Sequence, residues 1–271
     1  YEALTTTSTA STTVTDDADA TTVTISTTTA TVTEGGSIVY TATTSNPVTG
    51  SALVVTLSNG QTITIPVGQS SANSAAFAVR ADDTYAQGTQ TLAVTITGTT
   101  GGNYEAVTPT GTATTTVTDD ADATTVTITA SAASVTEGGS ITYTASVNNA
   151  VTGAPLVVTL SNGQTITIPV GQSSATGAAF AVRADDAYVQ GTQTLNVGIS
   201  STSGGSYEAL TTTSTASTSV TDDADATTLT VTASAASVTE GGSITYTASV
   251  NSAVTGAPLL VTLSNGQTIT I

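Results

Sequence analysis

The chain has 271 residues and a net charge of −17, because nineteen acidic residues face two arginines and no lysine or histidine. Such a chain cannot neutralise phosphates, which excludes nucleic acid and anionic membranes as partners. No apolar run reaches the roughly 18 residues that a membrane helix needs, so we expect no membrane insertion in this fragment. The absence of cysteine excludes disulfides and soft-metal sites. The chain is 38% hydrophobic, and its apolar and polar residues alternate regularly. Both features argue against disorder.

The sequence is organised as a tandem repeat. The motif VTDDADATT begins at Val14, Val117 and Val220, which gives a period of 103 residues without insertion. A unit of about 100 residues is large enough to fold as a domain. We therefore expect residues 1–19 to end a preceding repeat, 20–122 and 123–225 to be full repeats, and 226–271 to be the N-terminal part of a further one. The chain is expected to be a segment of a longer array.

Within one repeat, short stretches alternate apolar with polar residues, and none shows helical periodicity. The Asn162-Gly163 pair predicts a hairpin with a type I′ turn. Seven or eight short strands predict an all-β fold of tandem immunoglobulin-like antiparallel β-sandwiches, joined by short acidic linkers. In chain order, the strands are expected at residues 125–135, 140–147, 156–161, 164–170, 178–184, 192–200 and 211–221.

The acidic residues are confined to four motifs: the DDAD linker, the TEGG turn, the RADD loop and the YEA loop. Soluble domains usually spread mixed charges over their surface, so this confinement needs a cause. Strands that alternate in direction would bring the turn, the RADD loop and the end of the last strand to one pole. The six carboxylates expected there in the first full repeat are Glu34, Asp82, Asp83, Asp119, Asp120 and Asp122. The equivalent residues are Glu137, Asp185, Asp186, Asp222, Asp223 and Asp225 in the second repeat, and Asp16, Asp17 and Asp19 in the first linker.

Such a cluster predicts a bound cation. Two carboxylates about 6 Å apart repel by roughly 3 kcal/mol at an effective dielectric constant near 20. Oxygen-only ligands suit Ca²⁺, which takes about six to eight oxygens, whereas Mg²⁺ keeps more waters and Zn²⁺ or Cu²⁺ would want histidine or cysteine. Glu105 and Glu208 of the YEA motif lie at the other pole and would complete the site of the preceding linker; Glu240 repeats the TEGG position. Taken singly, the motifs also fit a solvated linker, an ordinary turn and a surface Arg–Asp pair.

Longer motifs carry a family resemblance. VTEGGSITYTASV at residues 135–147, LSNGQTITIPVGQSS at 160–174 and the VTDDAD end resemble the extender repeats of giant Gram-negative RTX adhesins, secreted by type I systems, which include biofilm adhesins and an ice-binding adhesin. The resemblance covers the whole chain. It implies an extracellular structural stalk at the surface of a Gram-negative bacterium, in which calcium bound by the linker acids rigidifies the junctions between neighbouring repeats of the same chain. Such a stalk would project a distal adhesive tip.

Three other functions compete with a stalk. Catalysis is not expected, because there is no histidine, cysteine or lysine and no serine near a base. The repeat could itself bind carbohydrate, with Tyr85, Tyr104, Tyr188 and Tyr207 as the candidate stacking rings, although we interpret them as packing residues. Exposed strand edges could support lateral or end-to-end self-association into an extracellular fibre or biofilm matrix. Near-identical repeats favour the stalk, because a spacer needs length more than individuality.

Overall fold

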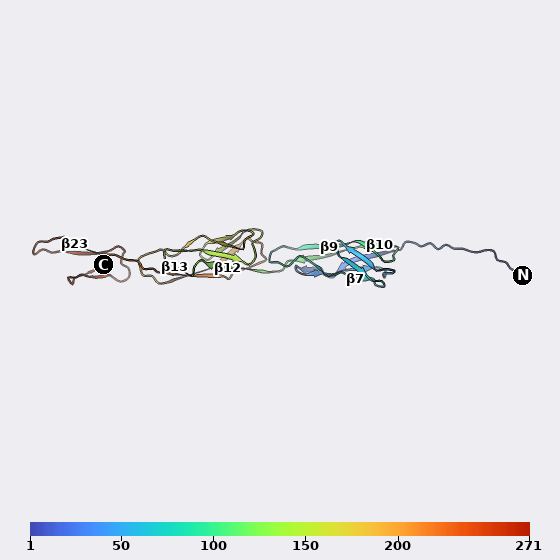
Figure 1. Ribbon diagram of the computed structural model, residues 1–271, viewed down its shortest axis with the longest axis horizontal. Coiled ribbons are helices and arrows are strands. Elements are labelled where there is room, and N and C mark those ends of the chain that lie inside the picture. The colour runs from blue at the N-terminus through green and yellow to red at the C-terminus, as the bar shows by residue number, and fades with distance from the viewer. The chain divides into compact units, whose positions relative to one another are not determined.

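The computed structural model describes residues 1–271, and all of its regular secondary structure is β. It contains no helix long and apolar enough to span a membrane. The chain divides into two compact units, Tyr1–Asp122 and Ala123–Ile271. Figure 1 labels strands from both units. The all-β, immunoglobulin-like architecture predicted from the sequence is confirmed.

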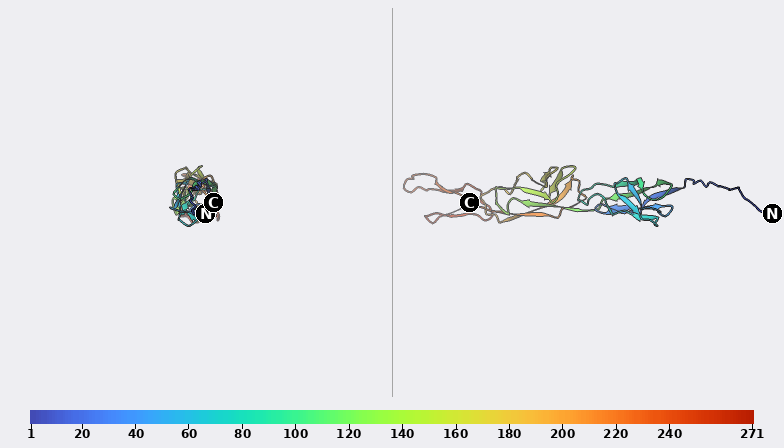
Figure 2. Two further views of the ribbon diagram at one scale, coloured as in Figure 1. Left: turned by 90° about the vertical axis from the view of Figure 1, so that its right-hand side faces the viewer. Right: turned by 45° about the vertical axis from the view of Figure 1, so that its right-hand side comes forward.

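The first unit is a sandwich of two sheets, seen in blue to green in Figure 2. Residues 1–19 precede it without regular secondary structure. One sheet has the order β10-β1-β4-β7 and the other β2-β11-β9-β5-β6, while β3 pairs with β8. The strands are β1 (Ala20–Thr27), β2 (Thr31–Thr33), β3 (Ser37–Ile38), β4 (Tyr40–Thr44), β5 (Leu53–Leu57), β6 (Thr62–Ile65), β7 (Ser71–Asn73), β8 (Phe77–Ala78), β9 (Gln90–Thr100), β10 (Ala106–Thr110) and β11 (Thr112–Thr118).

The second unit repeats this topology. Its sheets have the orders β18-β15-β12-β21 and β13-β22-β20-β16-β17, and β14 pairs with β19. Its last segment contributes two hairpins, β23-β24 and β25-β26. The strands are β12 (Ala123–Ala130), β13 (Ser134–Thr136), β14 (Ser140–Ile141), β15 (Tyr143–Val147), β16 (Leu156–Leu160), β17 (Thr165–Ile168), β18 (Ser174–Thr176), β19 (Phe180–Ala181), β20 (Gln193–Ser203), β21 (Ala209–Thr211), β22 (Thr215–Thr221), β23 (Leu229–Ala233), β24 (Tyr246–Val250), β25 (Leu260–Thr262) and β26 (Thr268–Thr270).

The core of each sandwich lies between its two sheets. In β15 the side chains of Tyr143, Ala145 and Val147 are buried, whereas Thr144 and Ser146 between them are half-buried. This is the face assignment that the two-residue alternation predicts, because successive side chains of a strand point to opposite faces. Threonine covers most of the outer faces, where its β-branched side chain favours the strand.

The first expected strand, residues 125–135, is divided between the two sheets. β12 pairs antiparallel with β15, and after residues 131–133 the chain continues in the other sheet as β13, which runs parallel to β22. The last expected strand, residues 211–221, is divided in the same way, since β21 pairs parallel with β12. These crossings fix the first and last strands of the repeat side by side in both sheets.

The Asn-Gly hairpin forms where predicted, but its turn is of another type. Gly163 has φ +84°, whereas no residue other than glycine has a positive φ, so a type I′ turn is ruled out. The Gly163 amide donates to the Leu160 carbonyl at 3.0 Å and Leu160 N donates to Gln164 O at 2.8 Å. This describes a three-residue loop in which glycine follows a type I turn. Asn162 instead uses Oδ1 to accept the Gln164 amide at 3.1 Å.

The final segment exposes side chains whose equivalents are core residues in the full repeats. Leu229 is 44% exposed and Tyr246 39% exposed, whereas Val126 is 0% and Tyr143 1% exposed. The segment has only the strands β23 to β26, paired in two hairpins, and it lacks the four- and five-stranded sheets that enclose the equivalent residues in the full repeats.

Candidate metal centre

Two parallel strands place the TEGG turn beside the linker. Thr33 at the end of β2 is paired with Thr118 at the end of β11, so the residues that follow both strands emerge at the same pole. The Glu34 amide donates to the Thr118 carbonyl at 3.0 Å, and Glu137 repeats the bond to Thr221 at 2.9 Å. The first turn is therefore fixed directly against the start of the DDAD linker.

The RADD loop is attached to the same turn. Gly35 N donates to Arg80 O at 2.8 Å, and Val79 N donates to Gly36 O at 3.1 Å. Gly35 has φ +70°, and a Cβ on it would lie 2.9 Å from the Cβ of Asp82. Glycine is required here both for the left-handed backbone and for the approach of the aspartate. The convergence of turn, loop and linker that the topology predicted is present.

Within this convergence, three or four carboxylates of each repeat come close together. One oxygen from each of Glu34, Asp82 and Asp120 lies within 4.8 Å of the others. In the second unit the equivalent group also contains the last acid of the linker and satisfies the same limit. Its members are Glu137, Asp185, Asp223 and Asp225.

The electrostatic cost of this proximity is visible in the pKa values. The charges of Asp120 and then Asp122 raise the pKa of the Asp82 carboxyl, with smaller contributions from burial and Asp83. Burial, followed by the charges of Asp185 and neighbouring aspartates, raises the pKa of Asp225. Burial is also the main cause of the raised pKa of Glu137, which its hydrogen bond to Arg183 only partly offsets. Each shift disfavours the charged form in the fold without a cation.

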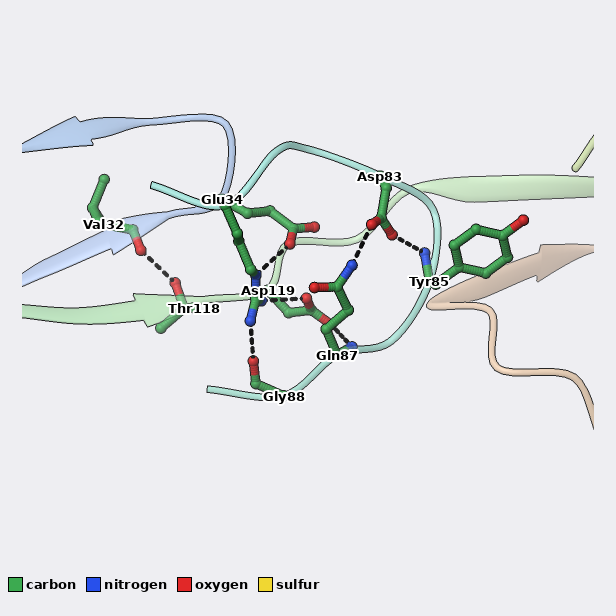
Figure 3. A network of polar contacts seen from close by, with 9 residues as sticks. Val32, Glu34, Asp83, Tyr85, Gln87, Gly88, Thr118 and Asp119 are labelled. Carbon is green, nitrogen blue, oxygen red and sulfur yellow. Dashed lines mark hydrogen bonds and ion pairs between the residues drawn. The ribbon is translucent and has the colours of Figure 1, made fainter. Parts of the chain in front are cut away.

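The single arginine of each repeat pairs with two acids, as Figure 3 shows for the first unit around Glu34 and Asp119. Arg80 Nε lies 2.6 Å from Glu34 Oε2 and Arg80 Nη2 lies 2.6 Å from Asp119 Oδ1. The Gln87 amide donates to the other oxygen of Asp119 at 2.9 Å. Both oxygens of Asp119 therefore accept hydrogen bonds from the protein, and its role as a cation ligand stays a prediction.

Asp83 has a third role, in shaping the RADD loop. Its Oδ1 accepts the Tyr85 amide at 2.8 Å, and its Oδ2 accepts a hydrogen bond from Gln87 Nε2 (Figure 3). Asp186 makes the same contacts with Tyr188 and Gln190. Adjacent aspartates of the motif thus diverge, with Asp82 joining the carboxylate group and Asp83 turning back into its own loop.

Glu105 lies at the opposite end of the first sandwich, as predicted for the YEA motif. β10 begins beside β1, with Ala106 paired to Ala20, and Glu105 Oε2 accepts a hydrogen bond from the backbone amide of Asp19. Through this contact, the Glu105 carboxylate holds the backbone of the residue that precedes β1. Its equivalent Glu208 is half-buried, while Asp16, Asp17 and Glu240 are exposed.

One buried oxygen provides the test of whether a cation fits. The Glu34 side chain is 0% exposed and that of Glu137 1% exposed, and in both residues Oε1 has no hydrogen-bond partner. Buried polar atoms normally have one. A buried carboxylate oxygen among other carboxylates, with no nitrogen or sulfur ligand near, suits a hard cation that accepts several oxygens. The residues present therefore fit Ca²⁺.

The tyrosines of the GG(N/S)YEA loops serve the packing of their own sandwich. Tyr104 OH donates to the Asn46 carbonyl at 2.9 Å, and a Cβ on Gly102 would lie 2.9 Å from the Tyr104 ring. Tyr207 OH donates to Asn149 O at 2.7 Å. This agrees with their interpretation as packing residues. Sequence reasoning missed the roles of the arginine and of Gln87, although two arginines in a chain of nineteen acids were a visible signal.

Comparison with known proteins gives one family. The model of the LapA domain matches residues 19–120, 122–223 and 225–271. A solved tetra-tandem repeat from the extending region of a large adhesion protein is 17% identical, with a TM-score of 0.29, and the match covers 93% of this chain and 62% of that one. The adhesin InvE of Yersinia pseudotuberculosis is 20% identical, with a TM-score of 0.22, over 74% of this chain and 58% of that one. No curated protein sequence matches.

Proposed function

Because this chain belongs to the LapA domain family, we propose that it forms part of the extender stalk of a bacterial surface adhesin, and that calcium stiffens its junctions. Family membership indicates adhesin extender-like repeats in tandem, and with them a structural, non-enzymatic role and a surface or extracellular location. The finer proposal concerns the acidic pole of each repeat. There, calcium would be held by Glu34, Asp82, Asp120 and Asp122, and by Glu137, Asp185, Asp223 and Asp225.

The observation that carries this proposal is the buried Oε1 atom of Glu34, repeated in Glu137. Exposed acids alone are ordinary on a protein surface, but a carboxylate oxygen that is shielded from water and lacks a partner is not. Its neighbours Asp82 and Asp120 bring further negative charge within 4.8 Å. When bound, the cation would neutralise this charge and accept the unpaired oxygen as a ligand.

Stiffening follows from which segments supply the ligands. Glu34 and Asp82 belong to the sandwich, whereas Asp120 and Asp122 belong to the linker, and β12 begins at Ala123, one residue later. Holding a linker residue in one conformation removes about 1 to 2 kcal/mol of backbone entropy, which cation binding would offset. Extracellular modules bind calcium at about 10⁻⁴ to 10⁻³ M, so such a stalk would be flexible inside a cell and rigid outside it.

A stalk of this kind would hold a distal adhesive tip away from the cell. Strands of roughly ten residues at about 3.3 Å each make every repeat a spacer of tens of ångströms. Repetition of one sequence with a period of 103 residues adds length without adding a new surface. Calcium bound by the linker acids would stiffen the array, so that its length holds the tip at a distance from the cell.

Small-angle X-ray scattering of the chain in calcium, in magnesium and without divalent cations tests the proposal. We expect the maximum dimension to increase and its distribution to narrow in calcium alone. The variant D120N/D122N/D223N/D225N should lose this response. The control D16N/D17N changes two aspartates of the same motif that do not belong to the carboxylate groups of the two sandwiches, and it should keep the response. Identical scattering of the unaltered chain in all three solutions would refute calcium stiffening.

A further inference from the structure

The guanidinium group of Arg80 joins three segments of the acidic pole. Its Nε donates to Glu34 Oε2 at 2.6 Å, its Nη2 to Asp119 Oδ1 at 2.6 Å and its Nη1 to the Gly88 carbonyl at 2.7 Å. Arg80 itself follows β8, so four stretches of chain meet at one side chain. Arg183 repeats the arrangement with Glu137 at 2.7 Å, Asp222 at 3.4 Å and Gly191 at 2.7 Å.

This arrangement divides the acids of the pole into two sets. The arginine occupies one oxygen of Glu34, and the other, Oε1, is left buried and unpaired in the group with Asp82 and Asp120. It also fixes Asp119, whose second oxygen accepts the Gln87 amide. The linker is thus attached to the sandwich at its first residue, while its second residue remains available for a cation.

We propose that Arg80 and Arg183 are the positioning residues of the cation site: each orients the free oxygen of its glutamate and fixes the start of the linker before any cation binds. This inference rests on the proposed function. A metal ligand is commonly oriented by a hydrogen bond to its second polar atom, and loss of that partner typically lowers metal affinity about 10- to 100-fold. The planar fork of arginine presents its donors in a fixed geometry to acceptors on three segments, whereas the ammonium of lysine is a compact point charge on a flexible stem.

Simple electrostatics predicts the opposite change in calcium affinity when the arginine is removed. The direction of that change therefore distinguishes a positioning role from a purely electrostatic one. If the arginine were only a neighbouring positive charge, its removal would make the pole more attractive to Ca²⁺ and affinity would rise. If it positions the ligand, affinity falls although a repelling charge has been removed. Replacement by lysine separates the two readings again, because lysine keeps the charge and loses the fork.

The experiment uses the full chain and calorimetric titration with CaCl₂. We expect R80Q/R183Q to bind Ca²⁺ about 10- to 100-fold more weakly than the unaltered chain, with the same number of ions, and R80K/R183K to be weakened by at least about 10-fold. Equal or tighter binding by R80Q/R183Q overturns the proposal, and so does full affinity in R80K/R183K. Protection of core amides such as Val55 and Val158 from hydrogen exchange verifies that each variant is folded.

Hydrogen exchange of the metal-free chain tests the positioning without any cation. The amides of Gln87 and Gln190 donate to Asp119 and Asp222, so they should exchange about 10-fold faster or more in both arginine variants. Unchanged exchange overturns the proposal. The variant D120N/D223N is the matched control: it should lose calcium affinity and keep slow exchange at Gln87. If the unaltered chain binds no calcium, the proposed function fails, whereas the exchange data still report on the arginine.

Discussion

Gly35 and Asp82 are packed so closely that a Cβ on the glycine would lie 2.9 Å from the Cβ of the aspartate. The contact brings the RADD loop onto the first turn and sets one acid of the cluster beside another. It also involves an atom that is fixed by the backbone of Asp82, so a side-chain rotation cannot relieve a clash. The shape of the acidic pole thus depends on the absence of a side chain at Gly35.

We expect Gly35→Ala to destabilise the first repeat by about 2 to 4 kcal/mol, because it adds left-handed backbone strain and an overpacked contact. Gly60→Ala is the matched control, since Gly60 has φ +83° but no atom within 4 Å of its would-be Cβ. It should cost only the strain, about 1 kcal/mol. Urea unfolding measures both. Equal losses would show that the Asp82 contact contributes nothing.

The raised pKa values of Asp82, Asp225 and Glu137 predict a pH dependence of stability in metal-free buffer. Above the ordinary carboxyl pKa of about 4, the folded chain binds more protons at these groups than the unfolded chain does. Stability from these groups is therefore present at low pH and is lost as pH rises through the raised values toward neutrality. Calorimetric melting should show Tm falling from about pH 4.5 to pH 7, and calcium should abolish the fall. A Tm that rises over this range without metal would contradict the assignment.

Replacement by alanine should affect stability differently at Asp82 and Asp83 in the metal-free chain at pH 7. Asp82→Ala removes a charge repelled by Asp120 and Asp122, so the urea midpoint should rise or stay constant. Asp83→Ala removes the acceptor for Tyr85 N and Gln87 Nε2, and we expect a loss of about 1 to 2 kcal/mol. Calcium titration completes the test, because only Asp82→Ala should abolish the first repeat's response. Two variants with the same behaviour would refute the division of roles.

Tyr104→Phe and Tyr207→Phe should weaken the other end of each sandwich. Each removes one hydroxyl bond to a loop carbonyl and keeps the ring, so the expected loss is about 0.5 to 1.5 kcal/mol for each repeat. Urea unfolding measures it, and calcium affinity should not change, because Glu34 and Asp82 lie at the opposite pole. A reduced calcium affinity in these variants would show that the two ends are coupled.

Much of the fold could be predicted because its determinants are local. The alternation of Tyr143, Ala145 and Val147 with threonine and serine determines which face is buried. The change of sheet after Ala130 could not be predicted, since residues 131–133 are small and compatible with a continuous strand. Only pairing with β22, distant in sequence, divides the strand there.

The position of the candidate site could also be predicted, because strand direction alone brings the turn, the loop and the linker to one pole. Which side chains pair with one another inside the site could not be predicted. Asp119, Asp120 and Asp122 are chemically equivalent in the sequence. Only the folded geometry shows that Asp119 pairs with Arg80 and that Asp120 lies beside Glu34. The predicted role of Asp120 as a calcium ligand stays a prediction.

Anomalous diffraction from crystals of the chain grown in calcium is the most direct test of the cation site. We expect a calcium peak beside Glu34 Oε1, shared with Asp82 and Asp120, and a second beside Glu137 Oε1. A structure without these peaks, in which water hydrogen-bonds the two glutamate oxygens and the aspartates are solvated, would contradict it.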